Sequence, residues 1–548
     1  MTGKLACSYL GTERCGDSAA KTELGSSRLM ASRSVEMQVS EYELKSRLKR
    51  HDIADLLQFP QEGFGAKTCF HFEGVDLSYR ELRRSSRALG AGLMSRGLKH
   101  QERVTTLLPN CLEIWQLYFA TAAARGIFMP LNRDLAPSEI AYMLNHASPR
   151  FIFTCSALLP KLEEALAALD YEPTVIMIDE AKPHGRRVDF LEAADVASLP
   201  AVDPEDVVII SYTSGSTSNP KAMAFSHRVE LDGAKLYEDA WGITSKDKVL
   251  IAMSLGWTFG VNPGSFPELR AGGSILLLEK FNPVKVLEAI EKHGITVMKG
   301  VPTMYAMMLA HVEETGKEYD LSSLRVALCA GADLPLTLAQ KFKQRFGLQL
   351  TNFLGMSEVK LVASPRCEND FFAPDGSVGT PPPGMEVRFV DENMQDVPTG
   401  QTGEFLVRSV AWMTGYFGDP EKTAACNLGG WYVSGDLGRR DEAGYIYYVG
   451  RLREQIIRGG AKIAPAEVEE VLMSRPDIAL CAVIGVPDEM YGEAVKAFIV
   501  SKDARLDTEA LKAYCAERLA NFKVPTIFEF VPDLPIGPTG KVQKKLLR

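Results

Sequence analysis

The sequence predicts an α/β protein with a large N-terminal domain of mostly parallel sheets and helices, a small β-subdomain, and a small α+β C-terminal domain. Three observations support this fold class. Short β-rich runs alternate with helical patterns, turn-rich segments begin at about residue 375, and the C-terminal segment combines two helical patterns with strands. Strands that alternate with helices are typical of parallel sheets with helical connections.

The first helix is expected over residues 77–98. Leu82, Leu89 and Leu93 fall on one stripe there, and Ser78 is a suitable N-cap. A strand over 102–109 and a second helix over 111–126 follow. Further β-rich runs, with helical segments between them, lie at 150–155, 174–179, 249–255, 273–279, 295–302, 324–331 and 348–355.

The C-terminal part differs from the rest of the chain in its composition and hydrophobic pattern. Residues 375–409 are turn-rich with short alternating runs, which predicts an antiparallel β-subdomain. A hinge is expected near 447–465, followed by a domain with helices over 466–476 and 508–520 and strands over 479–487 and 494–501. We therefore expect a large domain at 45–450 and a small mobile domain at 451–548.

Residues 1–44 are expected to be a disordered extension, because they are Ser-rich and aperiodic and contain no apolar signal region. A mitochondrial presequence is the alternative. The basic residues of this segment favour it, whereas Glu13, Asp17 and Glu23 are poorly suited to it.

Composition excludes several classes of protein. The net charge of -9 over 548 residues differs from the basic footprint of a nucleic-acid binder. The ten cysteines form no CxxC pair, which favours reduced thiols over zinc ribbons or redox motifs. No apolar run approaches the roughly 20 residues that span a bilayer. We expect a cytoplasmic protein without a transmembrane segment.

The loop YTSGSTSNPKAMAFSH, Tyr212–His227, carries the first chemical signal. It follows the apolar run EDVVIIS, and its Ser, Thr and Gly residues can turn backbone N–H groups inward to form an anion nest. Lys221 adds positive charge. The nucleotide-binding pattern G-x-x-x-x-G-K-[ST] is absent from the chain. An idle polar surface loop is the alternative interpretation.

Five further motifs follow this loop in order. They are LGMSE (354–358), GYFGDPEKT (415–423), WYVSGDLGRRDEAGYIYYVGRLREQI (431–456), GGAKIAPAEVE (459–469) and PIGPTGKVQKKLLR (535–548). With the loop, these motifs resemble the adenylate-forming superfamily of acyl-CoA synthetases, peptide-synthetase adenylation domains and beetle luciferases, over roughly residues 45–548. Within it, the resemblance is closest to AMP-producing acyl-CoA synthetases.

The resemblance implies residues that hold ATP and Mg²⁺. The positions matching the loop around the β- and γ-phosphates are Thr213, Ser214, Gly215, Ser216, Thr217 and Lys221. Ser357 matches a contact to the α-phosphate, and Glu358 matches the carboxylate that carries Mg²⁺, a role that suits this hard cation. The implied catalytic residues are Lys541, Glu358 and Thr213. Lys541, in PTGK, matches the catalytic lysine of the first half-reaction.

The resemblance also implies a nucleoside site. Asp436 matches the aspartate that accepts both ribose hydroxyls, and Arg451 matches a hinge arginine that reaches the ribose. The family often has an aromatic residue where Leu354 stands, so Phe353 or the region of Gly331 is expected to pack on adenine. Asn352 is expected to bond the edge of the base.

The acid and the thiol are placed in the same way. Gly459 and Gly460 match a strand that lines the pantetheine tunnel of coenzyme A. The acyl pocket is expected to include Trp257, Gly331, Ala332 and Gly355. No aspartate lies between Ser254 and Ser265 to hold an ammonium group, which argues against amino acids. Glycine at 355, where acetate-specific enzymes usually have tryptophan, predicts a medium-chain or aromatic acid.

The leading hypothesis is an AMP-forming carboxylic acid:CoA ligase that uses ATP and Mg²⁺. An adenylating enzyme that loads a carrier protein is the alternative, and a degenerate nucleotide-binding module is the second alternative. Ser218, Ala222 and Leu354 depart from the family pattern and favour the degenerate module, whereas retention of the other motif residues opposes it. The sequence leaves homodimer formation open.

Overall fold

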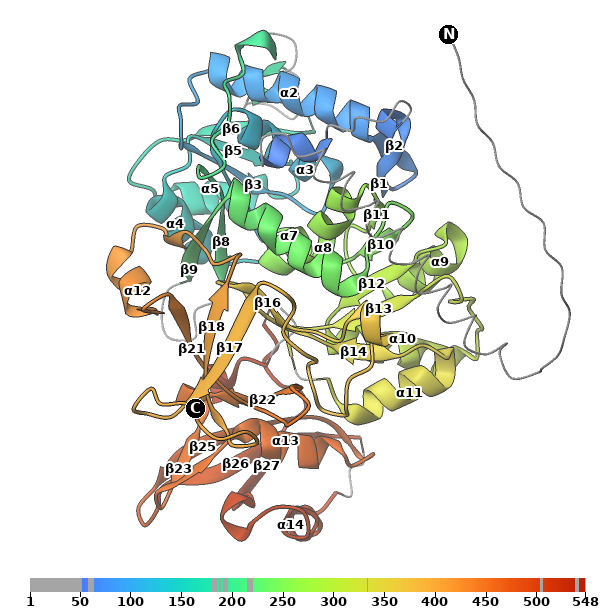
Figure 1. The fold of residues 1–548 in the computed structure, drawn as a ribbon, viewed down its shortest axis with the longest axis vertical. Coiled ribbons are helices and arrows are strands. Elements are labelled where there is room, and N and C mark those ends of the chain that lie inside the picture. Colours follow the sequence, from blue (N-terminus) through green and yellow to red (C-terminus); the bar gives the residue numbers. More distant parts are fainter. Residues whose placement is uncertain are drawn as a thin grey trace, which may run out of the picture. The chain divides into compact units, whose positions relative to one another are not determined.

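The computed structural model describes residues 52–57, 64–179, 185–186, 189–190, 196–213, 220–332, 334–502, 506–537 and 542–547 (Figure 1). The predicted extension at 1–44 lies outside these residues. The alternation of strands and helices confirms the predicted α/β class. None of the helices in the described part of the chain combines the length and the apolar character needed to cross a bilayer.

One eight-stranded sheet has the order β19-β9-β8-β4-β3-β5-β6-β7. Neighbours from β8 to β7 run parallel, whereas β9 is antiparallel to both β8 and β19. Its strands are β3 (Arg103–Leu107), β4 (Ile127–Leu131), β5 (Phe151–Thr154), β6 (Thr174–Met177), β7 (Gly185–Arg186), β8 (Val207–Thr213), β9 (Lys221–Ser226) and β19 (Gly415–Tyr416).

A seven-stranded sheet has the order β14-β13-β12-β10-β11-β1-β2 and is parallel except for the hairpin β1–β2. Its strands are β1 (Thr68–Phe72), β2 (Val75–Ser78), β10 (Lys248–Ile251), β11 (Ser274–Leu277), β12 (Val297–Gly300), β13 (Val326–Cys329) and β14 (Leu350–Asn352). A separate hairpin joins β15 (Leu354–Met356) to β16 (Lys360–Ala363).

Helices connect the parallel strands within each large sheet, as the sequence predicts. They are α3 (Leu112–Ala123), α4 (Pro137–Ala147), α5 (Leu159–Leu166), α8 (Thr258–Ala271), α9 (Pro283–His293), α10 (Pro302–Thr315) and α11 (Leu336–Phe346). Two further helices, α2 (Tyr79–Ser95) and α7 (His227–Trp241), connect a strand of one large sheet to a strand of the other. The predicted cap of α2 is confirmed: the Ser78 side chain accepts from the Glu81 N–H, and the Glu81 carboxylate accepts from the Ser78 N–H.

Helices α7 and α8 pack against each other between the two large sheets (Figure 1). α7 contacts β9, and α8 contacts β10 and β11. Pro267 of α8 has no N–H to offer the Pro263 carbonyl. The ammonium of Lys299 donates to that carbonyl at 2.7 Å and pairs with fully buried Glu268 at 2.7 Å. Proline in this helix is therefore compensated by a buried lysine.

The turn-rich segment folds as the expected antiparallel β-subdomain. Its sheet has the order β17-β18-β21-β20, and β22 also pairs with β21. The strands are β17 (Met385–Val390), β18 (Gly403–Ser409), β20 (Asn427–Leu428), β21 (Trp431–Arg440) and β22 (Ile446–Arg451), with helix α12 (Pro420–Ala425) beside them in sequence.

The C-terminal part is a small α+β unit with its own apolar core, which includes Val468, Val483, Ile499 and Leu511. Its sheet has the order β24-β23-β26-β25, with β27 on β26. The elements are β23 (Ile456–Arg458), β24 (Ala461–Ile463), α13 (Pro465–Met473), β25 (Ile478–Asp488), β26 (Gly492–Ser501), α14 (Thr508–Ala516) and β27 (Ile527–Phe530). The predicted boundary at 450 stays a prediction.

Candidate active site

The predicted phosphate loop is held at both ends by an antiparallel strand pair. β8 ends at Thr213, β9 begins at Lys221, and these two residues are register partners. Lys221 therefore lies opposite Thr213, at the base of the loop. Some predicted site residues lie outside the described part of the chain: Ser214, Gly215, Ser216, Thr217 and Lys541. The side chain of Thr213 lies outside it as well.

Lys221 lies in a cluster of charged and aromatic groups. Its ammonium is 5.6 Å from the centroid of the Tyr416 ring, and the Lys422 ammonium is 5.3 Å from the same centroid. Burial lowers the pKa of Lys221, while the charge of Glu358 acts in the opposite direction. Two cations thus face a single aromatic ring next to the loop, where an anion would relieve their mutual repulsion.

Glu358 lies between β15 and β16 and joins the same cluster. The Tyr416 hydroxyl donates to Glu358 Oε1 at 2.9 Å. Strand β19 brings Tyr416 here, because Tyr416 pairs with Met223 two residues after Lys221. Burial, followed by the Glu358 charge, raises the pKa of Tyr416 and of its neighbour Tyr432, so both keep their protons at neutral pH.

Tyr416 and Lys422 lie within the motif GYFGDPEKT, but the sequence alone predicted no role for them. The motif itself was the available signal. Their relation to Glu358 depends on the pairing of β19 with β9, two segments almost 200 residues apart in sequence, roughly the size of a whole domain. A local pattern does not reveal such a contact.

Asp436 and Arg451 are brought together by the register of β21 and β22, in which they are direct partners. Arg451 Nε lies 3.4 Å from Asp436 Oδ1, and the Tyr448 hydroxyl donates to the same oxygen at 3.5 Å. Gly435, at φ +72°, turns the chain just before the aspartate. The arrangement presents a carboxylate and a guanidinium side by side, and their predicted role in binding ribose stays a prediction.

Asn352 ends β14, and the Gly331–Ala332 segment follows β13, the neighbouring strand. Both therefore lie at the carboxyl edge of a parallel sheet, where ligands of α/β proteins usually bind. Asn352 Oδ1 is buried and accepts no hydrogen bond from the described residues. The amino group of an adenine could supply that missing donor.

The residues around Asn352 differ in exposure. Gly331 and Ala332 are exposed, and Leu354 is half-buried. Phe353 is 4% exposed, and its ring packs against those of Trp241 and Phe259, with centroids 5.1 and 5.9 Å away. Because this ring is part of the aromatic core, Leu354 and the Gly331 segment offer the more accessible surface for an adenine ring.

Trp257 and Gly355 are the predicted walls of the acyl pocket. Trp257 is half-buried at the N-cap of α8, and no residue in the described ranges bonds its Nε1. Gly355 is exposed. A Cβ at position 355 would lie 3.5 Å from both the Lys360 carbonyl oxygen and the Tyr237 hydroxyl. A Cβ therefore fits there in ordinary van der Waals contact.

Gly459 and Gly460 form the two-residue turn between β23 and β24, with φ values of +56° and +84°. Both are exposed, and the Gly459 N–H donates to the Tyr491 carbonyl at 2.7 Å. Hairpin turns with positive φ at both central residues favour glycine. The turn alone accounts for these two glycines, and their place in a pantetheine tunnel remains a prediction.

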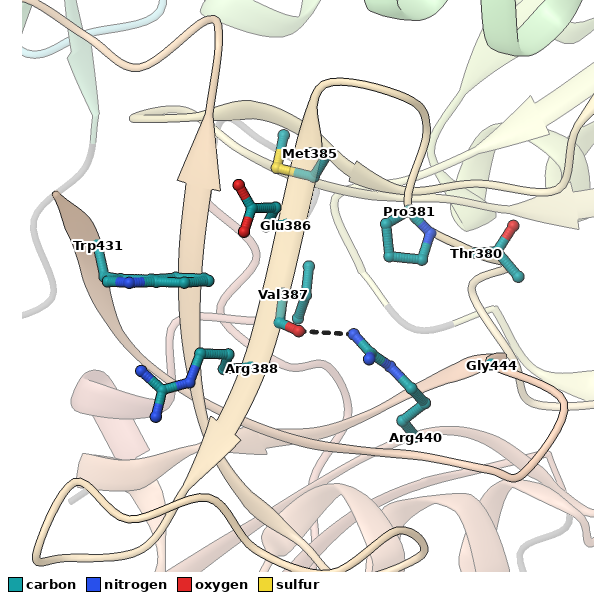
Figure 2. A pocket seen from close by; sticks show the side chains of 9 residues that line it. All are labelled: Thr380, Pro381, Met385, Glu386, Val387, Arg388, Trp431, Arg440 and Gly444. Carbon is teal, nitrogen blue, oxygen red and sulfur yellow. Dashed lines mark hydrogen bonds between the residues drawn. The ribbon is translucent and has the colours of Figure 1, made fainter.

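A separate hollow of about 600 Å³ lies on the β-subdomain (Figure 2). Its charged side chains already have partners: Arg388 pairs with Asp396 at 2.8 Å, and an Arg440 N–H donates to the Val387 carbonyl at 2.6 Å. None of the predicted site residues lines this hollow.

Comparison with known proteins identifies the family of this chain. The family model described as "AMP-binding enzyme" matches residues 58–417, and that described as "AMP-binding enzyme C-terminal domain" matches residues 467–541. A long-chain-fatty-acid–CoA ligase of Bacillus subtilis is 32% identical over 522 residues, covering 88% of this chain and 92% of the relative. A feruloyl-CoA synthase of an Amycolatopsis species is 35% identical over 485 residues, covering 88% and 95%.

The fold agrees with that of solved structures. The crystal structure of the anthranilate CoA ligase AuaEII in complex with anthranoyl-AMP superposes with a TM-score of 0.83 at 28% identity, covering 91% of this chain and 96% of that one. The first family model alone covers more than half of the chain. The protein therefore belongs to the adenylate-forming superfamily of AMP-binding enzymes, among the AMP-forming acyl-CoA ligases.

Proposed function

We propose that this AMP-forming acid–CoA ligase activates a medium-chain or aromatic monocarboxylic acid and transfers it to coenzyme A. The observation that supports the proposal most is the group of charged and aromatic side chains around Lys221, at the base of the predicted phosphate loop. Lys221 and Lys422 supply positive charge there, and Tyr416 holds the Glu358 carboxylate by a 2.9 Å hydrogen bond. Fixed cations beside a loop that can bind phosphate suit phosphoryl transfer.

The reaction has two steps. In the first, a carboxylate oxygen of the acid attacks the α-phosphorus of ATP, the bond to the bridging oxygen breaks, and pyrophosphate leaves with the bonding electron pair. In the second, the thiolate of coenzyme A attacks the acyl carbon and AMP leaves. Lys221 and the loop from Thr213 hold the outgoing phosphates, Ser357 contacts the α-phosphate, and Lys541 lowers the charge cost of joining two anions.

Glu358 is the residue we assign to Mg²⁺. No three His, Cys, Asp or Glu side chains converge on a metal-sized site in the described ranges. A single carboxylate fits this ion, because Mg²⁺ in nucleotide enzymes is usually bound by one or two carboxylates together with substrate phosphates. When bound, the ion neutralises phosphate charge. Asp436 and Arg451 orient the ribose, and Asn352 bonds the adenine.

Gly355 and Trp257 support the acid class. Gly355 is exposed and has no side chain to limit the length of the acid, which favours an acid longer than acetate. The two relatives described above are named for a long-chain fatty acid and for ferulate, and the solved structure contains an anthranoyl group. Because relatives at about 30% identity are named for such different acids, the acid of this enzyme has to be inferred from its own residues.

Transfer to a carrier protein remains the alternative acceptor, and Gly459 and Gly460 would serve a pantetheine arm of either kind. We expect domains at 45–450 and 451–548, a cytoplasmic enzyme, and either a monomer or a homodimer. Limited proteolysis tests the domain boundary: cuts near 450–456 support it, and resistance throughout that segment contradicts it.

A panel of carboxylic acids tests the proposed function. Pyrophosphate release is measured for each acid with ATP and Mg²⁺, with coenzyme A or with a phosphopantetheinylated carrier protein, and mass spectrometry identifies the thioester. The proposal predicts acyl-CoA from medium-chain or aromatic acids and little from acetate or amino acids. Preference for acetate over hexanoate and benzoate contradicts the acid class, and acyl transfer to the carrier alone contradicts the acceptor.

A further inference from the structure

A buried ion pair joins the hairpin that carries Glu358 to helix α7. Lys360 begins β16, and its ammonium pairs with the carboxylate of Glu230 in α7; both side chains are 1% exposed. We call these two residues the Lys360 pair. The side-chain N–H group of Asn262, in α8, donates to Glu230 Oε2 at 2.7 Å. The pair therefore attaches a short hairpin to the two helices that pack between the large sheets.

The Lys360 side chain also reaches the strand that leaves the predicted phosphate loop. Its ammonium lies 3.5 Å from the centroid of the Phe225 ring in β9, the strand that begins at Lys221. On α7 the stem of the lysine passes a glycine: a Cβ at Gly233 would lie only 2.9 Å from Lys360 Cγ. One lysine thus contacts both the strand that follows the loop and the helix that follows this strand.

Lys360 closes the turn that presents Glu358. Met356 and Lys360 are register partners, so the hairpin loop has three residues with Glu358 in the middle. The Val359 N–H donates to the Met356 carbonyl at 3.2 Å within this turn. Three-residue hairpin loops commonly end in a residue with left-handed backbone. Lys360 takes that position at φ +65°, a conformation that favours glycine.

The hairpin depends on attachments to the rest of the protein. β15 and β16 have only 3 and 4 residues and form a separate two-stranded sheet, and such a hairpin alone is at best marginally stable. From the β-subdomain, the Met413 N–H donates to the Glu358 carbonyl at 2.7 Å, and the Ser409 hydroxyl donates to the Val359 carbonyl at 3.0 Å. The Lys360 pair supplies the attachment to α7 and α8.

Folding stability alone does not explain these features. A buried ion pair gains little over apolar side chains of similar volume. The left-handed backbone of Lys360 adds a further cost, and strain of this kind concentrates at functional sites. A pair that fixes one geometry of a turn two residues away from it has a use in that turn, because Glu358 needs a fixed position relative to Lys221.

We propose that the Lys360 pair positions Glu358 for acyl-adenylate formation, by fixing the turn that holds this carboxylate near Lys221 and the phosphate loop. Lys360 and Glu230 are positioning residues, since they act through Glu358. The proposal rests on the proposed ligase function and on the assignment of Glu358 to Mg²⁺. A carboxylate that is free to move binds its ion more weakly, so loss of the pair should weaken the binding of ATP with Mg²⁺.

Calorimetry of ATP binding to the full-length enzyme, without acid, tests the proposal. Titrations with Mg²⁺ and with EDTA give two dissociation constants, and their ratio is the Mg²⁺ effect. Glu358→Gln is the reference variant and is expected to remove most of this effect. Lys360→Met with Glu230→Gln removes both charges of the pair. It is expected to weaken binding of ATP with Mg²⁺ roughly 10-fold and to keep the dissociation constant with EDTA close to that of the wild type.

The reaction provides a second readout for the same variants. Pyrophosphate release with a preferred acid is expected to slow roughly 10- to 100-fold in Lys360→Met with Glu230→Gln, the effect of a displaced catalytic group. The KM for the acid is expected to stay close to the wild-type value. If this variant does not fold, Lys360→Gly with Glu230→Gln replaces it, because glycine adopts the required φ without an anchoring side chain. The same losses are expected.

Each result decides the proposal. A folded double variant with the wild-type Mg²⁺ effect overturns it and leaves the ligase function intact. A wild-type enzyme without any Mg²⁺ effect also overturns it, because Glu358 then does not hold the ion. No pyrophosphate release by the wild-type enzyme with any acid overturns the ligase function and this proposal together.

A second buried pair, Arg270 with Glu238, provides the matched control. Its two side chains are 7% and 6% exposed, its N–O distance is 2.6 Å, and it joins the same helices, α8 and α7. Arg270→Met with Glu238→Gln is expected to lower the melting temperature but to keep the wild-type Mg²⁺ effect. An equal loss of the effect in this control would mean that general loosening of the two helices is responsible, and would overturn the proposal.

Discussion

Replacing Tyr416 with phenylalanine tests how the proposed magnesium carboxylate is held. The change removes the 2.9 Å hydrogen bond to Glu358 Oε1 and keeps the ring that faces Lys221 and Lys422. A hydrogen bond to a charged group contributes about 1.5–3 kcal/mol. We therefore expect acyl-adenylate formation to slow by roughly 10- to 150-fold.

Pyrophosphate release, measured over a series of Mg²⁺ concentrations, is the assay. Because a less well oriented carboxylate binds the ion more weakly, Tyr416→Phe is expected to need more Mg²⁺ for half-maximal rate. Tyr447→Phe is the matched control, since its hydroxyl donates to the Asp441 carboxylate at 3.1 Å on the β-subdomain. If Tyr416→Phe shows wild-type rate and Mg²⁺ dependence, Tyr416 does not position Glu358.

Three other outcomes are expected. Lys541→Ala should slow acyl-adenylate formation about 10²–10³-fold yet leave thioester formation from supplied acyl-AMP nearly intact; equal loss of both steps would contradict this division of labour. Gly355→Trp should shift the acid profile towards short chains, because an indole would take the place of the hydrogen that glycine carries beside Tyr237, and an unchanged profile would place the acyl group elsewhere. Burial lowers the pKa of His227 to about 4. Between about pH 6.5 and 4 the unfolded state therefore binds a proton at this residue that the folded state does not bind. The free energy of unfolding should fall by about 3 kcal/mol as the pH drops across this range. Denaturant unfolding in this pH range should show a shallower slope for His227→Asn, and an identical slope would exclude His227 as the source.

Local patterns predicted the fold well, because the sequence signals that determine its elements are local. Ser78 and Glu81 form a capping box within four residues, and the turn-rich composition after residue 375 matches a subdomain built of hairpins. The parallel sheets followed from the alternation of strands and helices. Strand order was not predicted, because it depends on contacts between segments far apart in the sequence.

The site was predicted in part, through motifs whose residues the structure then brings together. Asp436 and Arg451 are register partners in adjacent strands, and Lys221 lies near Glu358. The buried ion pair between Lys360 and Glu230 was not predicted, because the two residues are 130 apart in the sequence and each resembles an ordinary surface charge. Only packing shows that their charges are buried.

Isotope exchange tests the central claim most directly. The enzyme is incubated with ATP, Mg²⁺, labelled pyrophosphate and one acid of the preferred class, without coenzyme A, and label is counted in ATP. Reversible formation of an acyl-adenylate predicts exchange that depends on the acid and is lost in Glu358→Gln. Acid-dependent formation of ADP and phosphate, or no exchange with any acid that the enzyme converts to a thioester, would contradict the account.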